Sequence, residues 1–500
     1  MEVLSGPVLW ISASLFISYI FLLSYIGNKG KKFSQSMKGF ATAQGKVPPW
    51  IVGASFSATF ASANLYIGVP GLAYAHGLSV LWYVLGAFGV AWIALLLLAK
   101  KFWKVHHRAG GVSTLPEWLG KRYNSKSLQT IVSLLLLFNI YYIVGQNVGM
   151  ASIFETIMGI PYSAGIVIGV VITVFYIRLG GMFAQLITDG IQGILMGITG
   201  IIVFLSLFWT IGGGFSVFSE LKSQLAAADP GLVTPFSDGG PYDNALAVIA
   251  IQFLMIGFVL TPQLANKFLS LEKEEDLRPF TMSAGINLFF ISTLMVFGGL
   301  AARVIAPGIS NMDHALPMYL MEAFPPIIVG ILVIGLLSAI LSSTDGLYVT
   351  VTSSIGNDIV KPLLERFSSL SADAVDKWAV TASKWSLILV GGLSLYLSIQ
   401  PPESLALLIQ FSFSAIISGT FGAILLGYFW DGGNRYGATA SVLVGSGTYI
   451  WLTSFEVLGN IYVALFLCSV LSFITMYVIS YVTSYTRLRH ASVLNLLNKS

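Results

Sequence analysis

Apolar stretches of about 20 residues recur along almost the whole chain, from Pro7 to Ser484. A helix of that length crosses the roughly 30 Å of hydrocarbon in a bilayer, because each residue adds about 1.5 Å. Hydrophobic residues make up 56% of the chain and charged residues 10%, whereas a soluble domain carries about 25% charge. We therefore expect an all-α polytopic membrane protein whose main solvent is the lipid bilayer.

About thirteen transmembrane helices are predicted from these stretches. Their expected bounds are 7–27, 48–74, 78–100, 128–156, 161–178, 185–211, 244–266, 280–305, 324–359, 378–398, 404–429, 437–455 and 460–484. The Gly- and Pro-containing segment 212–243 is expected to form an ordered cap between two spans. We expect one membrane domain over residues 1–500, because no low-complexity tract or soluble module interrupts it.

The basic residues predict how the chain is oriented in the membrane. When thirteen spans are counted, only Lys222 and Arg303 of the 26 Lys and Arg residues fall on the side opposite to the others. The positive-inside rule then places the N-terminus outside and the C-terminus in the cytoplasm of the inner cell membrane. No Lys or Arg precedes the first apolar stretch, unlike in a secretory signal, so we expect it to remain as a span.

Several functional classes are disfavoured. The net charge of +4 does not gather in a basic tail or patch, so a nucleic-acid partner is not expected, and no obligate protein partner is evident. The single cysteine, Cys468, excludes an internal disulfide and a metal cluster of thiolates. The five histidines fall in predicted loops, the tail or span edges, so we find no catalytic constellation and expect no enzyme. About sixteen residues follow the last span, too few for a signalling output domain.

Small and polar residues gather in the second predicted span. The segment 55–71 reads SFSATFASANLYIGVPG, and Gly68, Pro70 and Gly71 close it. Such a helix can break, which lipid tolerates only where the freed carbonyls line a cavity or bind an ion. The alternative is a continuous helix whose Ser and Ala residues allow close packing against neighbours. The residues leave both interpretations open.

Hydroxyl groups and one carboxylate interrupt the apolar ninth span. Ser342, Ser343, Thr344 and Asp345 lie near its middle. Hydroxyls can bond back to the preceding turn, but an Asp at this depth costs about 3 kcal/mol and usually marks an ion site or a pathway. Hydroxyl, carbonyl and carboxylate oxygens are hard ligands that suit an alkali cation. This segment predicts a sodium site.

Other polar residues at membrane depth have two interpretations each. Asp189 lies near the cytoplasmic start of the sixth span, where an Asp alone is more often a partner of the helix dipole, worth under about 1 kcal/mol. Amide side chains occur singly on other spans and individually are more often contacts between helices than ligand contacts. At comparable depth they could together line one solute cavity; they are Asn64, Gln146, Asn147, Gln252 and Gln410.

Three motifs in the chain are similar to those of the sodium:solute symporter family. The strongest is GGxxAxxxTDxxQ, present over residues 180–192; the others are AIxSS over 339–343 and IGxPG over 67–71. The resemblance covers nearly the full length and implies a leucine-transporter-type core of two inverted five-helix repeats. These repeats would occupy 48–211 and 244–429, with 1–27 as an extra span and 437–484 as two C-terminal spans.

The resemblance also implies ligands for co-transported sodium. By residue match, the ion would lie between the second and ninth spans and be held by Ala58, Ala61, Ala339, Ser342 and Ser343. Asp189 matches an acidic residue that is implicated in sodium coupling in the family, which favours a functional role over the helix-dipole interpretation. Where some members place two further serines, this chain has Asp345 and Gly346. Asp189 and Asp345 are therefore the candidates for a second cation.

The expected cargo is a small organic solute. The segments 67–78, 159–162 and 229–235 are most similar to pantothenate-type symporters, so a monocarboxylate such as pantothenate is the first hypothesis. Residues 260–263 and Lys267 depart from a Gly-x-Pro-His segment followed by Arg in many relatives, so the substrate specificity of those relatives does not carry over directly. An amino acid such as proline is one alternative solute. Gln410 matches a glutamine that contacts solute in sugar-carrying members, so sugar or sialic acid stays open too. A proton-coupled carrier is a further alternative. The expected solute contacts are Asn64, Gln146, Gln252 and Gln410.

Overall fold

The computed structural model describes residues 7–108, 112–400 and 405–497, and no strand occurs in them. The helices that follow the apolar stretches are α1 (Pro7–Gly30), α3 (Pro49–Ala63) with α4 (Val69–His76), α5 (Leu81–Val84) with α6 (Ala91–Arg108), α8 (Lys126–Leu135) with α9 (Asn139–Met158), α10 (Tyr162–Thr210), α12 (Ala245–Val259) with α13 (Pro262–Leu269), α14 (Leu277–Ile305), α16 (Pro326–Ser354), α18 (Ala372–Ile399), α19 (Leu405–Phe429), α20 (Arg435–Ser454) and α21 (Ile461–Leu497). The all-α fold predicted from the sequence is confirmed.

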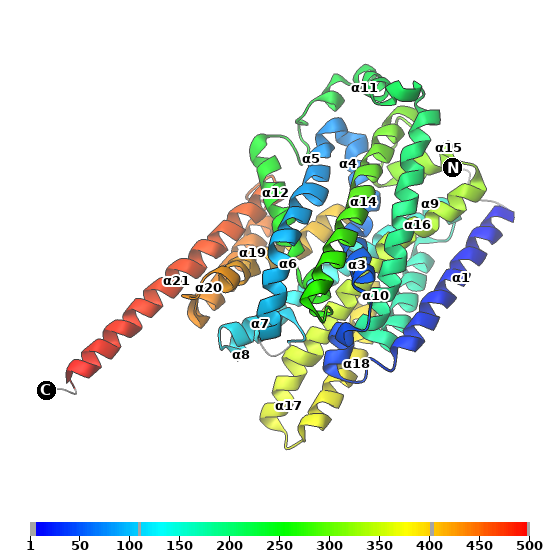
Figure 1. Cartoon of the computed structure of the whole chain (residues 1–500). Coiled ribbons are helices and arrows are strands. Elements are labelled where there is room, and N and C mark those ends of the chain that lie inside the picture. Colours follow the sequence, from blue (N-terminus) through cyan, green and yellow to red (C-terminus); the bar gives the residue numbers. More distant parts are fainter. Residues whose placement is uncertain (1–6, 109–111, 401–404, 498–500) are drawn as a thin grey trace.

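Short helices connect the long ones at the two ends of the molecule. They include α2 (Met37–Thr42), α7 (Leu115–Arg122), α11 (Val217–Ala228), α15 (Ala315–Ala323) and α17 (Lys361–Phe367). In Figure 1, α11 and α15 lie at one end, together with the start of α1, whereas α7, α17 and the end of α21 lie toward the other. This placement agrees with an odd number of crossings, although which end faces the cytoplasm remains a prediction.

Eight helical stretches in the described residues are long and apolar enough to cross a membrane. Some hold two predicted spans. The helix α10 has 49 residues, about 73 Å of helix, which is more than twice the hydrocarbon thickness. It turns at Gly181, whose φ of 54° and ψ of −144° are open to glycine and strained for other residues. Gly181 therefore separates the two predicted spans without ending the helical assignment.

The second predicted span is broken, which decides between the two interpretations of its sequence. The break lies at Ser62, with φ 55° and ψ 175°, and a π-helical turn, Asn64–Gly68, leads from there into α4. A second interruption separates α12 from α13, where Pro262 begins the new helix. Proline suits that first position because it has no N–H to leave unpaired.

The centre of the molecule is formed by α3, α10 and α16, which contact one another, while α1 lies on one flank and α20 and α21 on the opposite flank (Figure 1). In α16 every residue from Leu336 to Ser354 is buried. A helix that is apolar on all sides is expected in such a central position. Small residues allow the close approach: a Cβ added to Gly193 of α10 would lie 2.7 Å from the carbonyl oxygen of Ala54 in α3.

Candidate ion and solute site

Hydroxyls of α16 meet carbonyl oxygens of α3 directly before the break. The Ser342 hydroxyl lies 3.0 Å from the carbonyl oxygens of both Ala58 and Ala339, and the Ser343 hydroxyl donates to the carbonyl of Thr59 at 3.0 Å. In return, the Thr59 hydroxyl lies 3.2 Å from the Ser342 carbonyl. All five residues are buried. The two helices are thus joined by uncharged oxygen atoms of the kind that can replace the water shell of an alkali cation.

The predicted sodium ligands are distributed unevenly around this contact. The Ser342 hydroxyl contacts the carbonyl oxygens of Ala58 and Ala339. The Ser343 hydroxyl donates to the carbonyl of Thr59, the residue after Ala58 in α3. The Ala61 carbonyl accepts the N–H of Asn64 at the end of α3. The structure therefore brings four of the five together at the α3–α16 contact and places the fifth at the adjoining break. Their role as sodium ligands stays a prediction.

Two side chains satisfy backbone groups freed by the break. The N–H of Ala63 donates to Oε1 of Gln146 on α9 at 3.0 Å, and the N–H of Asn64, which also donates to the Ala61 carbonyl, lies 3.2 Å from Oγ of Ser62. Without Gln146, the Ala63 N–H would be left unpaired at membrane depth, which costs several kcal/mol in hydrocarbon. Gln146, expected to contact solute, thus also holds the broken helix in place.

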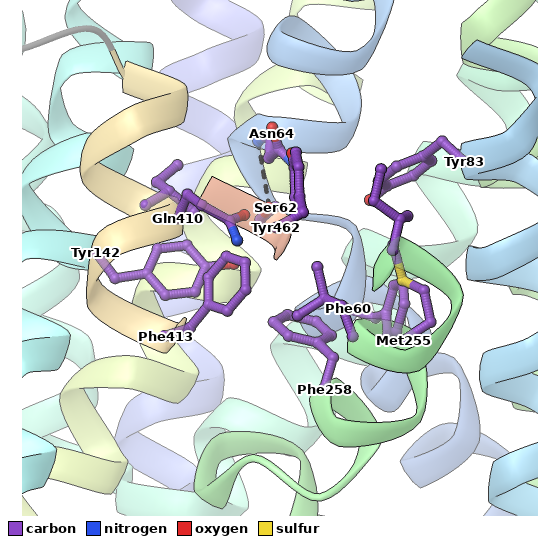
Figure 2. Close-up of a pocket in the computed structure, with 13 residues that line it drawn as sticks. Phe60, Ser62, Asn64, Tyr83, Tyr142, Met255, Phe258, Gln410, Phe413 and Tyr462 are labelled. Carbon is purple, nitrogen blue, oxygen red and sulfur yellow. Dashed lines mark hydrogen bonds between the residues drawn. The ribbon is translucent and has the colours of Figure 1, made fainter. Parts of the chain in front are cut away.

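A pocket opens beside the break and faces α12 and α19 (Figure 2). Its lining consists mainly of rings and aliphatic side chains, with amides and hydroxyls at a few points. The lining residues are Phe60, Ser62, Asn64, Tyr83, Tyr142, Ile251, Leu254, Met255, Phe258, Ile409, Gln410, Phe413 and Tyr462. No Lys, Arg, Asp or Glu occurs in this described lining. Such a surface can hold an apolar body against rings while a few polar groups fix its orientation.

The predicted solute contacts fall into two groups. Asn64 and Gln410 line the pocket, and Figure 2 shows their side chains at its edge. Gln410 also donates to the Ser414 hydroxyl at 2.8 Å. Gln146 and Gln252 do not belong to the lining, and Gln252 instead donates to the carbonyl of Trp82 at 3.0 Å. Asn147 bonds to the Ser398 hydroxyl at 3.1 Å, away from the pocket lining.

Asp189 is placed in a buried cluster next to the α3–α16 contact. Its Oδ2 atom lies 2.8 Å from Nζ of Lys267 on α13, and both side chains are 0% exposed. The same oxygen accepts the hydroxyl of Thr59 at 3.0 Å and the amide of Gln185 at 3.1 Å. The sequence pointed to Lys267 only as a departure from the family's solute-binding segment. Its pairing with Asp189 was missed because Lys267 follows the predicted seventh span and is easily assigned to the cytoplasmic interface.

Asp345 belongs to the same buried cluster. It accepts the hydroxyl of Tyr176 on α10, and it interacts electrostatically with both Asp189 and Lys267. One oxygen of each carboxylate, Oδ1 of Asp189 and Oδ2 of Asp345, has no hydrogen-bond partner among the described residues. The two candidates for a second cation therefore lie in one cluster, which already contains an ammonium group.

Replacing Gln146 by leucine tests its part in the break. The Ala63 N–H would lose its acceptor, and we expect destabilisation of about 1–3 kcal/mol, the typical cost of one buried unpaired group. Because the break adjoins the pocket, solute affinity should fall as well. Thermal unfolding in detergent and uptake by proteoliposomes measure the two effects. Gln252→Leu is the matched control, since the Trp82 carbonyl that Gln252 contacts also accepts the N–H of Leu85 and keeps a partner. Equal stability of the two leucine variants would contradict the role of Gln146.

The sequence of this chain matches a family of membrane transporters. The profile described as the sodium:solute symporter family matches residues 40–445. The chain is 30% identical over 430 residues to a sodium/pantothenate symporter of Haemophilus influenzae, and the match covers 86% of this chain and 84% of that protein. It is 28% identical over 416 residues to the osmoregulated proline transporter OpuE of Bacillus subtilis, covering 81% of each.

A solved structure of a sodium-coupled sialic acid symporter, substrate-bound and outward-open, shares the fold. It matches with a TM-score of 0.78 at 19% identity and covers 94% of this chain and 98% of that one. At this identity the likeness concerns the fold alone, and it confirms the predicted leucine-transporter-type class. The relatives named above are transporters, in agreement with the expectation that the chain is not an enzyme.

Proposed function

The chain belongs to the sodium:solute symporter family, and we propose that it imports a small organic solute together with sodium by alternating access. One observation carries the proposal most directly. Ala58, whose carbonyl meets α16, and Ser62, which lines the pocket, lie four residues apart on the same broken helix. An ion bound at the first position is thus about one helical turn from a solute bound at the second.

In this mechanism sodium enters from outside and is held by carbonyls and hydroxyls between α3 and α16. Ion binding fixes the break, and the fixed break completes the solute pocket. Rocking of the helices then exposes both sites to the cytoplasm, where low sodium empties the ion site and loosens the pocket. Each ligand should raise the affinity for the other, because the coupling free energy is reciprocal.

The sodium gradient is sufficient for accumulation of a neutral solute. One sodium ion moving down about 100 mV and a tenfold gradient releases roughly 3.7 kcal/mol, equivalent to several-hundred-fold accumulation. For a monoanion the voltage contribution vanishes when one sodium accompanies it. A second cation would restore that contribution, and Asp189 and Asp345 are where the sequence places its candidate ligands.

The solute we favour is a monocarboxylate such as pantothenate. The relative that is 30% identical is a sodium/pantothenate symporter, and the pocket offers amides, hydroxyls and rings to a molecule with polar groups on an aliphatic body. A carboxylate would be bound by neutral donors, since the described lining has no basic residue. Proline is the second candidate, supported by OpuE, and sialic acid or a sugar is the third.

The membrane placement completes the proposal. The chain is a multi-pass membrane protein, and we assign it to the inner cell membrane with its N-terminus outside and its C-terminus in the cytoplasm. This assignment rests on the basic residues of the predicted loops. The partners we propose are the solute, sodium and the bilayer, with neither nucleic acid nor an obligate protein subunit.

Uptake by proteoliposomes containing the purified chain tests this function. With an inward sodium gradient, we expect accumulation of pantothenate from a panel that also contains proline, acetate, lactate, sialic acid and sugars. Replacing sodium by choline at constant pH should reduce uptake to that of protein-free liposomes. Preference for proline would change the assigned solute but not the coupling. Uptake that continues in choline and follows the pH gradient would instead indicate a proton-coupled carrier.

A further inference from the structure

Lys267 places a positive charge inside the transporter core. Its side chain is 0% exposed, and its Nζ lies 2.8 Å from Oδ2 of Asp189 and 2.5 Å from the hydroxyl of Ser55 on α3. The Ser55 hydroxyl also lies 3.3 Å from Asp189 Oδ2. The lysine reaches this position because α12 ends before Pro262 and α13 begins a new helix there. A carboxylate and a hydroxyl thus surround the ammonium group.

This arrangement is chemically equivalent to an occupied cation site. Carboxylate and hydroxyl oxygens are the ligands that an alkali ion would need, and an ammonium group satisfies the same oxygens while tethered to the chain. A buried carboxylate without a cation is strongly unfavourable. Lys267 therefore neutralises Asp189 without a transported ion, and it is one positive charge for the two carboxylates of the cluster, Asp189 and Asp345.

The same cluster is connected to the proposed sodium site through one side chain. The hydroxyl of Thr59 lies 3.0 Å from Oδ2 of Asp189 and 3.2 Å from the carbonyl of Ser342. A change of charge at Asp189 therefore alters the hydrogen bonding of Thr59, which is itself part of the α3–α16 contact. This connection links the ammonium group to ion coupling and gives it more than a local structural effect.

We propose that the Lys267 ammonium is a built-in cation that stands at Asp189 in place of a transported ion. The transporter therefore binds one sodium ion fewer than it would bind if residue 267 carried no charge. The proposal rests on sodium binding as proposed above and adds the stoichiometry. It leaves the sodium between α3 and α16 as it is. Removal of the ammonium group alone should open Asp189 to an additional sodium ion.

Binding of radioactive sodium to the purified protein without solute tests the stoichiometry. If the wild-type chain binds n ions at saturation, Lys267→Gln should bind one more, because Asp189 then lacks its cation. Lys267→Arg keeps the charge and should bind n. The double variant Lys267→Gln with Asp189→Asn removes both charges and should return to n. A purely structural ion pair would leave the ion count unchanged in every variant.

The outcomes separate this inference from the proposed function. A wild-type chain that binds no sodium would overturn sodium coupling itself. A wild-type chain that binds sodium, together with a Lys267→Gln variant that binds the same number, would overturn only the role of Lys267. Asp189→Asn alone gives an independent answer if Lys267→Gln does not fold. We expect it to bind n ions, and a count of n minus one would show that Asp189 holds a transported ion and refute the inference.

Discussion

Replacing Ser342 and Ser343 together by alanine is expected to raise the sodium concentration for half-maximal uptake about a hundredfold or more. Each hydroxyl lies 3.0 Å from a carbonyl oxygen of α3, so both stand at the contact where we place the ion. A hydrogen-bonding group next to a charge contributes about 1.5–3 kcal/mol, and about 1.4 kcal/mol corresponds to a tenfold change in affinity. Two lost oxygens therefore weaken sodium binding by at least two orders of magnitude.

Thr352→Val is the matched control for the double serine variant. Thr352 is also a buried hydroxyl residue of α16, but its hydroxyl donates to the carbonyl of Tyr348 at 2.7 Å, one turn back on the same helix. We expect its sodium dependence to stay close to that of the wild type. Sodium-dependent uptake over a range of sodium concentrations measures both variants. A double serine variant with unchanged sodium dependence would place the ion elsewhere.

The fold was accessible from sequence because the bilayer imposes strict rules on it. Length and composition predicted the helices, and the small residues of 55–71 indicated that the helix there can break. The position of the break was harder to predict. Gly68, Pro70 and Gly71 are the usual candidates, yet the strained residue is Ser62, with φ 55°. A break there depends on Gln146, a partner from another helix that no local pattern reveals.

The candidate site was only partly accessible. Ser342 and Ser343 were identified because hydroxyls are conspicuous in an apolar helix, and Asn64 and Gln410 for a similar reason. Rings such as Phe60 and Phe258 occur on many membrane helices, so their presence in the pocket depends on packing alone. The pairing of Lys267 with Asp189 was missed because the sequence position of Lys267 suggests the membrane interface. The turn before Pro262 carries it into the core instead.

Asp358 is a third buried carboxylate after Asp189 and Asp345, and it lies beyond the end of α16, the helix that bears the two serines. It lies in the π-helical turn Ile355–Val360 and accepts hydrogen bonds of 2.8–2.9 Å from Thr114, Gln129, Ser354 and Asn357. No salt bridge to Asp358 occurs in the part of the chain that the structure describes. Neutral donors alone therefore stabilise this carboxylate. Through them, Asp358 joins the end of α16 to the residue before α7 and to the start of α8.

Asp358→Leu is expected to destabilise the protein by at least about 3 kcal/mol, because three buried donors and the half-buried amide of Gln129 lose their shared acceptor. Each buried donor left unpaired costs about 1–3 kcal/mol, and only some can find another acceptor. Thermal unfolding in detergent should show a midpoint lowered by about 3 °C or more. The control is Asp373→Leu, which removes an exposed acid from the first turn of α18 and should cost under about 1 kcal/mol. Equal midpoints for the two variants would mean that the donors around Asp358 are satisfied without it, and that the end of α16 is held by apolar packing instead.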